Sequence, residues 1–289
     1  MTMNMMQMVA IMVVCYLVTL TALCIYRKEI NIKIANAMFM IVDAAFFMCW
    51  TYASYINGWS ESGFMAFDNI SPFTMTLIPL TVFLNKKARS YCESTIAFLW
   101  LGMFVALIVS PQHTYIFSET SEATFGHTTE AASHLIASLY GIYLIISGQV
   151  KCNLKSLKRA MIFLFSVIGI GVVANYALRT SNFGMNPYGN YSIYMLDIFR
   201  SFEATLVAYL LGVFIVLLAG MQFGNLLNKL VGSDDEGKDG ESDKDDSAEE
   251  AVTDQADDKI IEAQDTDLML LDENAEELPP DAENGALSE

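Results

Sequence analysis

Cysteine is scarce in the 289-residue sequence, and no two cysteines stand in a CxxC motif. Zinc sites and redox-active dithiols depend on such closely spaced cysteines. Four of the five cysteines fall within or beside apolar runs, where a thiol packs as a small apolar side chain. The sequence therefore predicts neither a disulfide framework nor a zinc site. The five residues are Cys15, Cys24, Cys49, Cys92 and Cys152.

The motifs of soluble catalytic machinery are also missing. No P-loop, GxSxG, HExxH or dinucleotide fingerprint stands in a fitting sequence context. We therefore expect no bound cofactor, and any chemistry has to come from side chains outside these patterns.

Aromatic residues are absent from residues 233–289, where the acidic charge of the chain is concentrated. This segment has 23 Asp and Glu against 3 Lys, whereas residues 1–232 have 13 Lys and Arg against 10 Asp and Glu. A segment of this composition cannot bury a core, so we predict a disordered, acidic cytoplasmic tail. Its charge repels phosphate, which excludes nucleic acid as a partner. Such a tail either recruits a basic cytoplasmic protein or merely solvates the chain.

Long apolar runs fill residues 1–232, and the mean hydropathy of the whole chain is +0.38. At 1.5 Å per residue, each run is long enough to cross a hydrocarbon core of about 30 Å, the fifth only if it extends a little at its ends. The third run is the weakest, because it contains Asp68, Pro72 and Pro79. The predicted spans are residues 5–26, 35–57, 64–84, 91–110, 131–147, 160–178 and 202–223.

Basic residues alternate between the segments that join the seven runs. The segments after the first, third and fifth runs hold ten Lys and Arg, and the other three hold two. The positive-inside rule then predicts seven helices, with the N-terminus outside and the C-terminus inside. A re-entrant third run would break this alternation, so we expect it to cross with a kink at Pro79. Arg27 and Lys28 follow the first run instead of preceding it, which favours an uncleaved helix over a signal peptide.

The predicted fold is thus an all-α bundle of seven transmembrane helices over residues 1–232, followed by the tail of residues 233–289. We expect a multi-pass protein of a membrane, most simply a bacterial cell membrane. Its oligomeric state is left open by the sequence.

Four polar residues lie in or near the apolar runs: Asp43, His134, Asn175 and Glu203. A charged group at the centre of a membrane helix costs about 2.5–3.5 kcal/mol, so such groups face the bundle interior or water. They either join helices by hydrogen bonds or form a functional pocket. His134 is the best acid–base candidate, because imidazole titrates near neutral pH, and Asp43 or Asn175 would orient it.

His127, Glu130 and His134 share one helical face if the fifth helix begins early. Three candidate ligands on one helix, without a second motif, do not predict a metal site. We expect His127 and Glu130 at the wet outer end of the helix and His134 in its buried part.

The order of these elements resembles the YwaF-type integral membrane proteins, which are related in architecture to vertebrate acyltransferases that remodel ether phospholipids. The similar region covers residues 26–220. It consists of an acidic residue followed by two tryptophans, a histidine followed by a basic segment, and asparagines before a proline: Asp43, Trp50 and Trp59; His134 and residues 151–159; Asn175, Asn182, Phe183 and Pro187. The resemblance implies a membrane lipid as ligand or substrate.

The reactive motif of that family is degenerate in this chain. The family often has Pro-Leu-His-Leu-Cys at the start of the third helix, where this chain has Pro72-Phe73-Thr74-Met75-Thr76. Thr74 stands in place of the histidine and Thr76 in place of the cysteine. A threonine hydroxyl without an adjacent base is a far poorer nucleophile than a thiolate, so acyl transfer would need another nucleophile.

We therefore expect an outward-facing polar pocket that binds or acylates a membrane lipid, formed by His134, Asp43, Thr74, Thr76, Glu130, Asn175, Asn182 and Glu203. Two other functions stay open. Asp43 and His134 would form a proton path in a transporter, although no inverted repeat is apparent. Alternatively, the chain is a non-catalytic scaffold whose tail recruits a partner.

Overall fold

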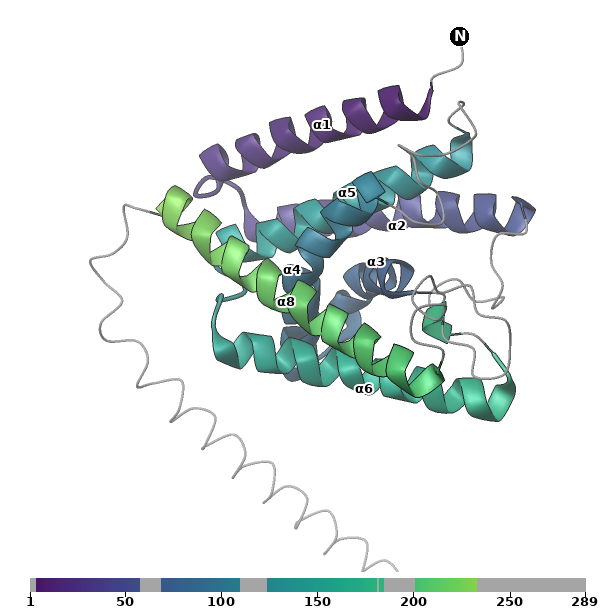
Figure 1. Ribbon diagram of the computed structural model, residues 1–289. Coiled ribbons are helices and arrows are strands. Elements are labelled where there is room, and N and C mark those ends of the chain that lie inside the picture. The colour runs from purple at the N-terminus through teal and green to yellow at the C-terminus, as the bar shows by residue number, and fades with distance from the viewer. Residues whose placement is uncertain (1–3, 58–68, 110–123, 181, 185–200, 233–289) are drawn as a thin grey trace, which may run out of the picture. The chain divides into compact units, whose positions relative to one another are not determined.

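The computed structural model of the protein describes residues 4–57, 69–109, 124–180, 182–184 and 201–232. Within these ranges the chain forms seven α-helices and no strand, which confirms the predicted all-α class (Figure 1). The helices are α1 (Met5–Tyr26), α2 (Ile32–Asn57), α3 (Ile70–Leu80), α4 (Lys86–Val109), α5 (Phe125–Ile146), α6 (Leu154–Leu178) and α8 (Phe202–Gly232). Two 3-10 turns, η2 (Thr81–Phe83) and η3 (Asn182–Gly184), complete the described elements.

The chain divides into two compact units, Met1–Val231 and Gly232–Glu289. The described helices belong to the first unit, apart from the last residue of α8. The predicted acidic tail, residues 233–289, lies outside the described residues.

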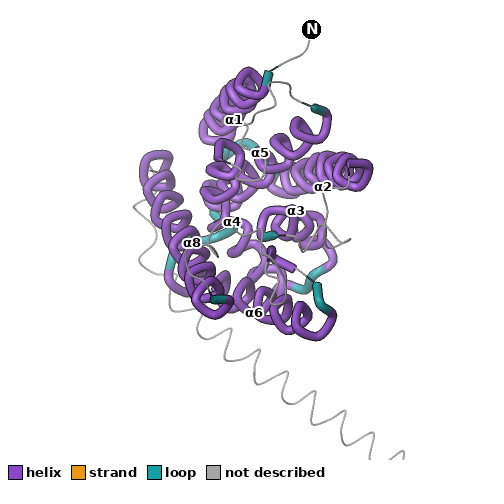
Figure 2. The backbone as a smooth tube through the Cα atoms, turned by 45° about the vertical axis from the view of Figure 1, so that its right-hand side comes forward, coloured by secondary structure: helices purple, strands orange, loops and turns teal. Residues whose placement is uncertain are grey.

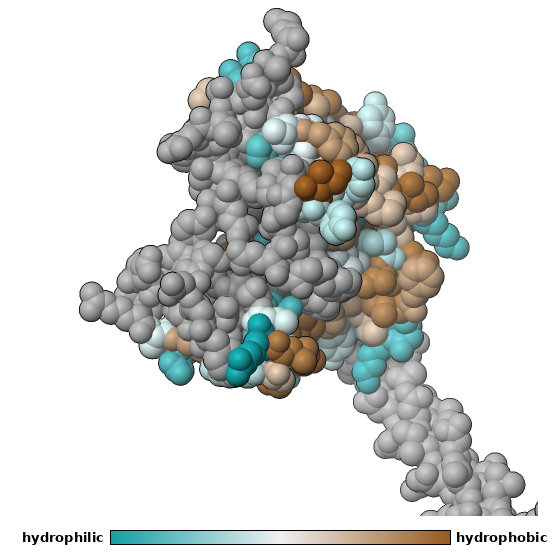
Figure 3. Space-filling model, turned by 90° about the vertical axis from the view of Figure 1, so that its right-hand side faces the viewer, coloured by the Kyte–Doolittle hydropathy of each residue, from teal (hydrophilic) through white to brown (hydrophobic). Residues whose placement is uncertain are grey.

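Five helices are long and apolar enough to cross a membrane: α1, α2, α5, α6 and α8. Four of them, α1, α2, α6 and α8, carry exposed large apolar side chains, such as Leu17, Ile41, Ile170 and Val207, each more than half exposed. Figure 3 shows such apolar side chains on one face of the protein. Water-soluble monomers rarely expose so much apolar surface, whereas lipid tails solvate it well. The helices fit a membrane-embedded protein.

The predicted third span is shorter as a helix than the sequence indicates. α3 covers 11 residues, about 16 Å, with Pro79 in its last turn. The chain then changes to the 3-10 turn η2, so the regular α-helix ends just after the proline at which the kink was predicted. Pro79 lacks an N–H and crowds the preceding turn, which favours an ending at this point. The total of seven crossings and their orientation remain predictions.

α5 lies among the other helices and contacts α1, α2, α3 and α4, as Figure 2 also shows. Apart from its first residue and Thr128, its side chains are buried along the whole helix. α2 packs against it in the antiparallel sense, because Phe39 meets Tyr143 (ring centroids 5.4 Å apart) and Trp50 meets His134. The enclosed position of α5 explains how a helix with several polar residues is accommodated in the bundle.

Glycines allow α4 to lie close to both α5 and α8. A Cβ atom at Gly141 of α5 would lie 2.7 Å from the carbonyl oxygen of Ile96, and one at Gly220 of α8 would collide with the carbonyl of Phe98. Small residues at membrane helix crossings permit this kind of close backbone approach. The crossings hold α4 between α5 and α8.

Candidate functional site

The beginning of α5 is fixed by a reciprocal cap between Thr124 and His127. The Thr124 side chain accepts a hydrogen bond from the His127 backbone N–H, and the Thr124 backbone N–H donates to His127 Nδ1 at 3.3 Å. His127 is only 8 % exposed and Glu130 only 4 %, so the expected wet position of both residues is wrong. α1 packs beside this end of α5, where the Thr128 hydroxyl donates to Met8 Sδ, and a single-helix pattern does not reveal such a neighbour.

His134 is the most informative polar residue of α5. Its Nδ1 lies 2.9 Å from the carbonyl oxygen of Glu130, one turn earlier. A carbonyl oxygen only accepts hydrogen bonds, so Nδ1 carries the proton. In the neutral ring the lone pair is then on Nε2, which makes Nε2 the atom able to accept a proton or a hydrogen bond. The imidazole is 3 % exposed.

Trp50 of α2 lies beside this imidazole. The two ring centroids are 5.7 Å apart and the planes are inclined by 51°. Trp50 is also in edge contact with Phe47, with ring centroids 6.0 Å apart. The indole thus forms an aromatic wall next to His134, and it is held there by packing within α2.

Asp43 is completely buried in α2, and neither of its carboxylate oxygens has a hydrogen-bond partner among the described residues. It precedes Trp50 by two helical turns, about 10 Å along the axis. Asp43 therefore makes no hydrogen bond to His134, although both residues lie on packed helices. A buried, unsatisfied polar group is costly and calls for an explanation other than packing.

The two threonines of α3 are engaged within their own helix. Thr74 Oγ1 donates to the carbonyl of Ile70 at 2.7 Å, and Thr76 Oγ1 donates to the carbonyl of Pro72 at 2.8 Å. Thr74 is fully buried and Thr76 partly so. Both hydroxyl protons are thus committed to carbonyls, and among the described residues neither hydroxyl is paired with a base that would activate it.

Asn175 and Asn182 are brought together by the turn that follows α6. Asn175 Oδ1 accepts from the backbone N–H of Asn182 (2.7 Å), from Asn182 Nδ2 (2.8 Å) and from the Thr180 hydroxyl (2.9 Å). Asn175 Nδ2 donates to the carbonyl of Asn182 at 2.9 Å. The turn itself requires positive φ at Arg179 (56°) and Phe183 (55°). Asn175 thus clamps the turn onto α6.

Phe183, at the end of this clamp, is 2 % exposed and covers Gly171 of α6, where a Cβ atom would lie 2.7 Å from its ring. It also contacts Phe73 of α3, with ring centroids 5.8 Å apart. Glu203, the remaining predicted pocket residue, is exposed in the first turn of α8. Among the predicted residues, His134 and Glu130 form one group, and Asn175 and Asn182 form another.

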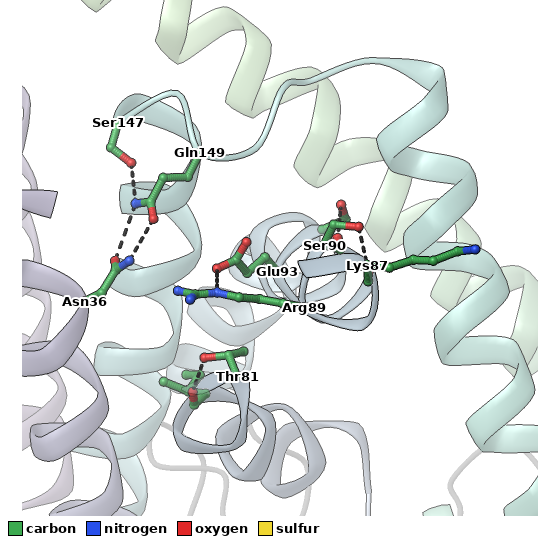
Figure 4. A network of polar contacts seen from close by, with 10 residues as sticks. Asn36, Thr81, Lys87, Arg89, Ser90, Glu93, Ser147 and Gln149 are labelled. Atoms are coloured by element: carbon green, nitrogen blue, oxygen red, sulfur yellow. Dashed lines mark hydrogen bonds and ion pairs between the residues drawn. The ribbon is translucent and has the colours of Figure 1, made fainter. Parts of the chain in front are cut away.

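Sequence reasoning missed a second polar region near the end of α5 (Figure 4). Asn36 Nδ2 donates to Gln149 Oε1 at 2.7 Å, and Gln149 Nε2 donates to Ser147 Oγ at 2.8 Å. In the same view, Arg89 Nε donates to Glu93 Oε1 at 2.7 Å, which raises the pKa of the Arg89 guanidinium. The i, i+4 spacing of this pair was readable in the sequence, because oppositely charged residues so spaced pair on a helix.

No group of three or more His, Cys, Asp or Glu side chains in the described ranges is placed to hold a metal ion. The chemistry that the described residues offer is therefore that of a buried imidazole, a buried carboxyl group and an aromatic wall. Comparisons with family models, with curated proteins and with solved structures gave no match to this chain.

Proposed function

We propose that this protein is a multi-pass integral membrane protein that binds the polar headgroup of a membrane lipid beside the first half of α5. The observation that carries the proposal is the pairing of a buried imidazole with an aromatic wall: His134 of α5 lies against Trp50 of α2. A lipid-facing bundle needs no such polar group for packing, and polar groups within membrane helices commonly mark a site.

The chemistry of these side chains fits a cationic headgroup. The face of an indole attracts ammonium groups, which is how choline is recognised in aromatic cages. Glu130, one turn before His134, supplies a buried carboxyl group that pairs with such a cation. Nε2 of His134 accepts a hydrogen bond from the headgroup. A phosphatidylethanolamine headgroup satisfies all three, because its ammonium group also carries N–H donors, which the choline headgroup lacks.

Binding is favoured over acyl transfer, since both threonines that replace the His and Cys of the YwaF-type motif donate to their own helix. The membership in that family and the outward-facing position of the pocket are part of the proposal. They are supported by the order of the sequence elements and by the distribution of basic residues.

The test uses the full chain in lipid nanodiscs, with native mass spectrometry to count retained phosphatidylethanolamine. We expect Trp50→Leu and His134→Ala each to weaken retention at least tenfold. Ser138→Ala serves as the control, because the hydrogen bonds of Ser138 in the described part of the chain go to Tyr16 and to the carbonyl of Trp100. Equal retention in all variants would reject the proposal. Altered acyl-chain profiles in cells lacking the protein would instead support acyl transfer.

Proton-coupled transport is a second candidate, favoured by the buried carboxyl group of Asp43 and its lack of a hydrogen-bond partner in the described part of the chain. A carboxyl group of this kind takes up and releases protons during transport in many membrane pumps. Vesicles containing the protein should then show solute uptake that depends on a pH gradient, and Asp43→Asn should abolish it. Solute uptake that does not depend on the pH gradient would exclude proton-coupled transport.

A further inference from the structure

The outer surface of α6 has a hollow of about 590 Å³ near the start of the helix. The described residues that line it recur at intervals of three and four, so they share one face of α6. The lining is apolar except for Lys158, at the end of the hollow nearer the start of α6, and Ser166 at its other end. Its main residues are Leu154, Leu157, Lys158, Met161, Ile162 and Phe165.

The charge around this hollow is positive and lacks nearby acidic compensation in the sequence. No Asp or Glu occurs between Glu130 and Asp197, whereas four basic residues occur between residues 151 and 159. Lys158 is exposed and makes no ion pair within the part of the chain that the structure describes. The basic cluster in the first turn of α4 differs, because Arg89 is paired with Glu93. A free cation at the edge of an apolar hollow attracts an anion that carries an apolar chain.

The position of Lys158 along α6 suits the boundary between hydrocarbon and headgroups. α6 has 25 residues, about 37 Å, so it exceeds a hydrocarbon core of about 30 Å by a little more than one turn. Lysine side chains on a helix incline toward its N-terminus and extend to the interface. The ammonium of Lys158 then lies at headgroup depth, while Met161, Ile162 and Phe165 lie deeper.

We propose that this hollow is a binding site for an anionic phospholipid. The phosphate and the negatively charged headgroup lie beside Lys158, and an acyl chain lies along Met161, Ile162 and Phe165. The positive end of the α6 dipole adds to the attraction, since the helix begins at Leu154 beside the same site. This site is separate from the proposed headgroup pocket, because its residues belong to the outer face of α6 and its ligand carries net negative charge.

The experiment compares two lipids with the same acyl chains, phosphatidylglycerol and phosphatidylcholine, on the full chain in mixed nanodiscs. Native mass spectrometry then gives the ratio of the two lipids retained by the protein. We expect phosphatidylglycerol to be enriched, and Lys158→Gln to weaken its retention about fivefold, which corresponds to about 1 kcal/mol for one basic residue at an anionic surface. Lys158→Arg keeps the charge and should retain the enrichment.

Lys33→Gln is the matched control, since Lys33 is an exposed basic residue at the start of α2. The proposal is overturned if Lys158→Gln leaves the amount of retained phosphatidylglycerol unchanged, or if Lys33→Gln and Lys158→Gln have the same effect. It is also overturned if the hollow takes a second copy of the chain, which would appear as a dimer lost in an Ile162→Lys variant. The failure of this test leaves the His134 pocket untouched, because the two are read out with different lipids.

Discussion

The indole N–H of Trp100 donates a hydrogen bond of 3.0 Å to the backbone carbonyl of Gly220, which joins α4 to α8. The bond exists at the place where Gly220 lies directly against the backbone of Phe98. A tryptophan N–H buried in a membrane protein needs such an acceptor, because lipid offers none. At this helix crossing, Gly220 allows the two backbones to approach closely, and the indole N–H of Trp100 joins them by a hydrogen bond.

Gly220→Ala should destabilise the protein. The added methyl group would collide with the carbonyl of Phe98, a backbone atom that cannot move aside, and would separate α4 from α8. Overpacking of this kind costs about 1–3 kcal/mol. The thermal midpoint in detergent, followed by tryptophan fluorescence, measures the effect. Gly212→Ala in the same helix is the control, because a Cβ atom there meets nothing within 4 Å, and equal loss in both variants would contradict the crossing.

Asn175→Ala should weaken the turn after α6. The substitution removes the acceptor of three hydrogen bonds and the donor of a fourth, and it leaves polar atoms of Thr180 and Asn182 without these partners. Unsatisfied groups of this kind cost about 1–3 kcal/mol. We expect a lower thermal midpoint together with faster exchange of the Asn182 amide hydrogen. Val173→Ala, at an exposed apolar position of α6, should change neither quantity.

Cys152 should react slowly with maleimides. Burial raises the pKa of its thiol from 9.0 to about 11, and only the thiolate reacts. At pH 8 the folded chain should therefore be alkylated about a hundredfold more slowly than the same chain denatured in detergent, as followed by mass spectrometry. The rate should rise about tenfold per pH unit up to pH 11. A chain with Cys152 as its single cysteine keeps other thiols out of the measurement, and a rate independent of folding would refute the prediction.

The raised pKa of the Cys152 thiol also determines how the folding stability changes with pH. Between pH 9 and 11 the folded chain keeps the Cys152 proton that the unfolded chain releases, so stability falls as the pH rises through this window. Cys152→Ala should remove this part of the pH dependence.

The predicted orientation can be tested at the two ends of α5. A single cysteine at position 151 should react with an impermeant maleimide only after the cells are permeabilised, and one at position 124 should react in intact cells. The distribution of basic residues places position 151 inside, because Lys151 belongs to the largest basic cluster. The reverse labelling pattern would invert the topology and move the proposed headgroup pocket to the inner side.

The long apolar helices were predictable because a run of about 20 uncharged residues has few stable alternatives in a membrane protein. α1, α2, α5, α6 and α8 follow directly from this rule. The extent of the third helix could not be predicted in this way. Hydropathy indicates which segments prefer lipid, but it does not indicate the residue at which a helix ends. The change to η2 just after Pro79 depends on local backbone geometry that hydropathy does not encode.

The types of residue in the candidate site could be predicted from the sequence. Which of these side chains contact each other could not. The buried imidazole of His134 stood out from its apolar surroundings, whereas its contact with Trp50 joins positions 84 residues apart. The clamp of Asn175 on Asn182 depends on positive φ at Arg179 and Phe183, two residue types that rarely adopt it. Tertiary packing determines such conformations, and the backbone preferences of single residues do not predict them.

The enclosure of α5 has a consequence for how the chain enters the membrane. α5 is the least apolar of the five long helices, and it carries His127, Glu130 and His134 in its first half. Inserted alone, such a segment would partition poorly from the translocon into lipid, because buried ionisable groups raise the free energy of transfer. Synthesis proceeds from α1 onward, so α1, α2, α3 and α4, which all pack against α5, are complete before it emerges. The order of the helices along the chain thus supplies α5 with a protein environment in time for its insertion.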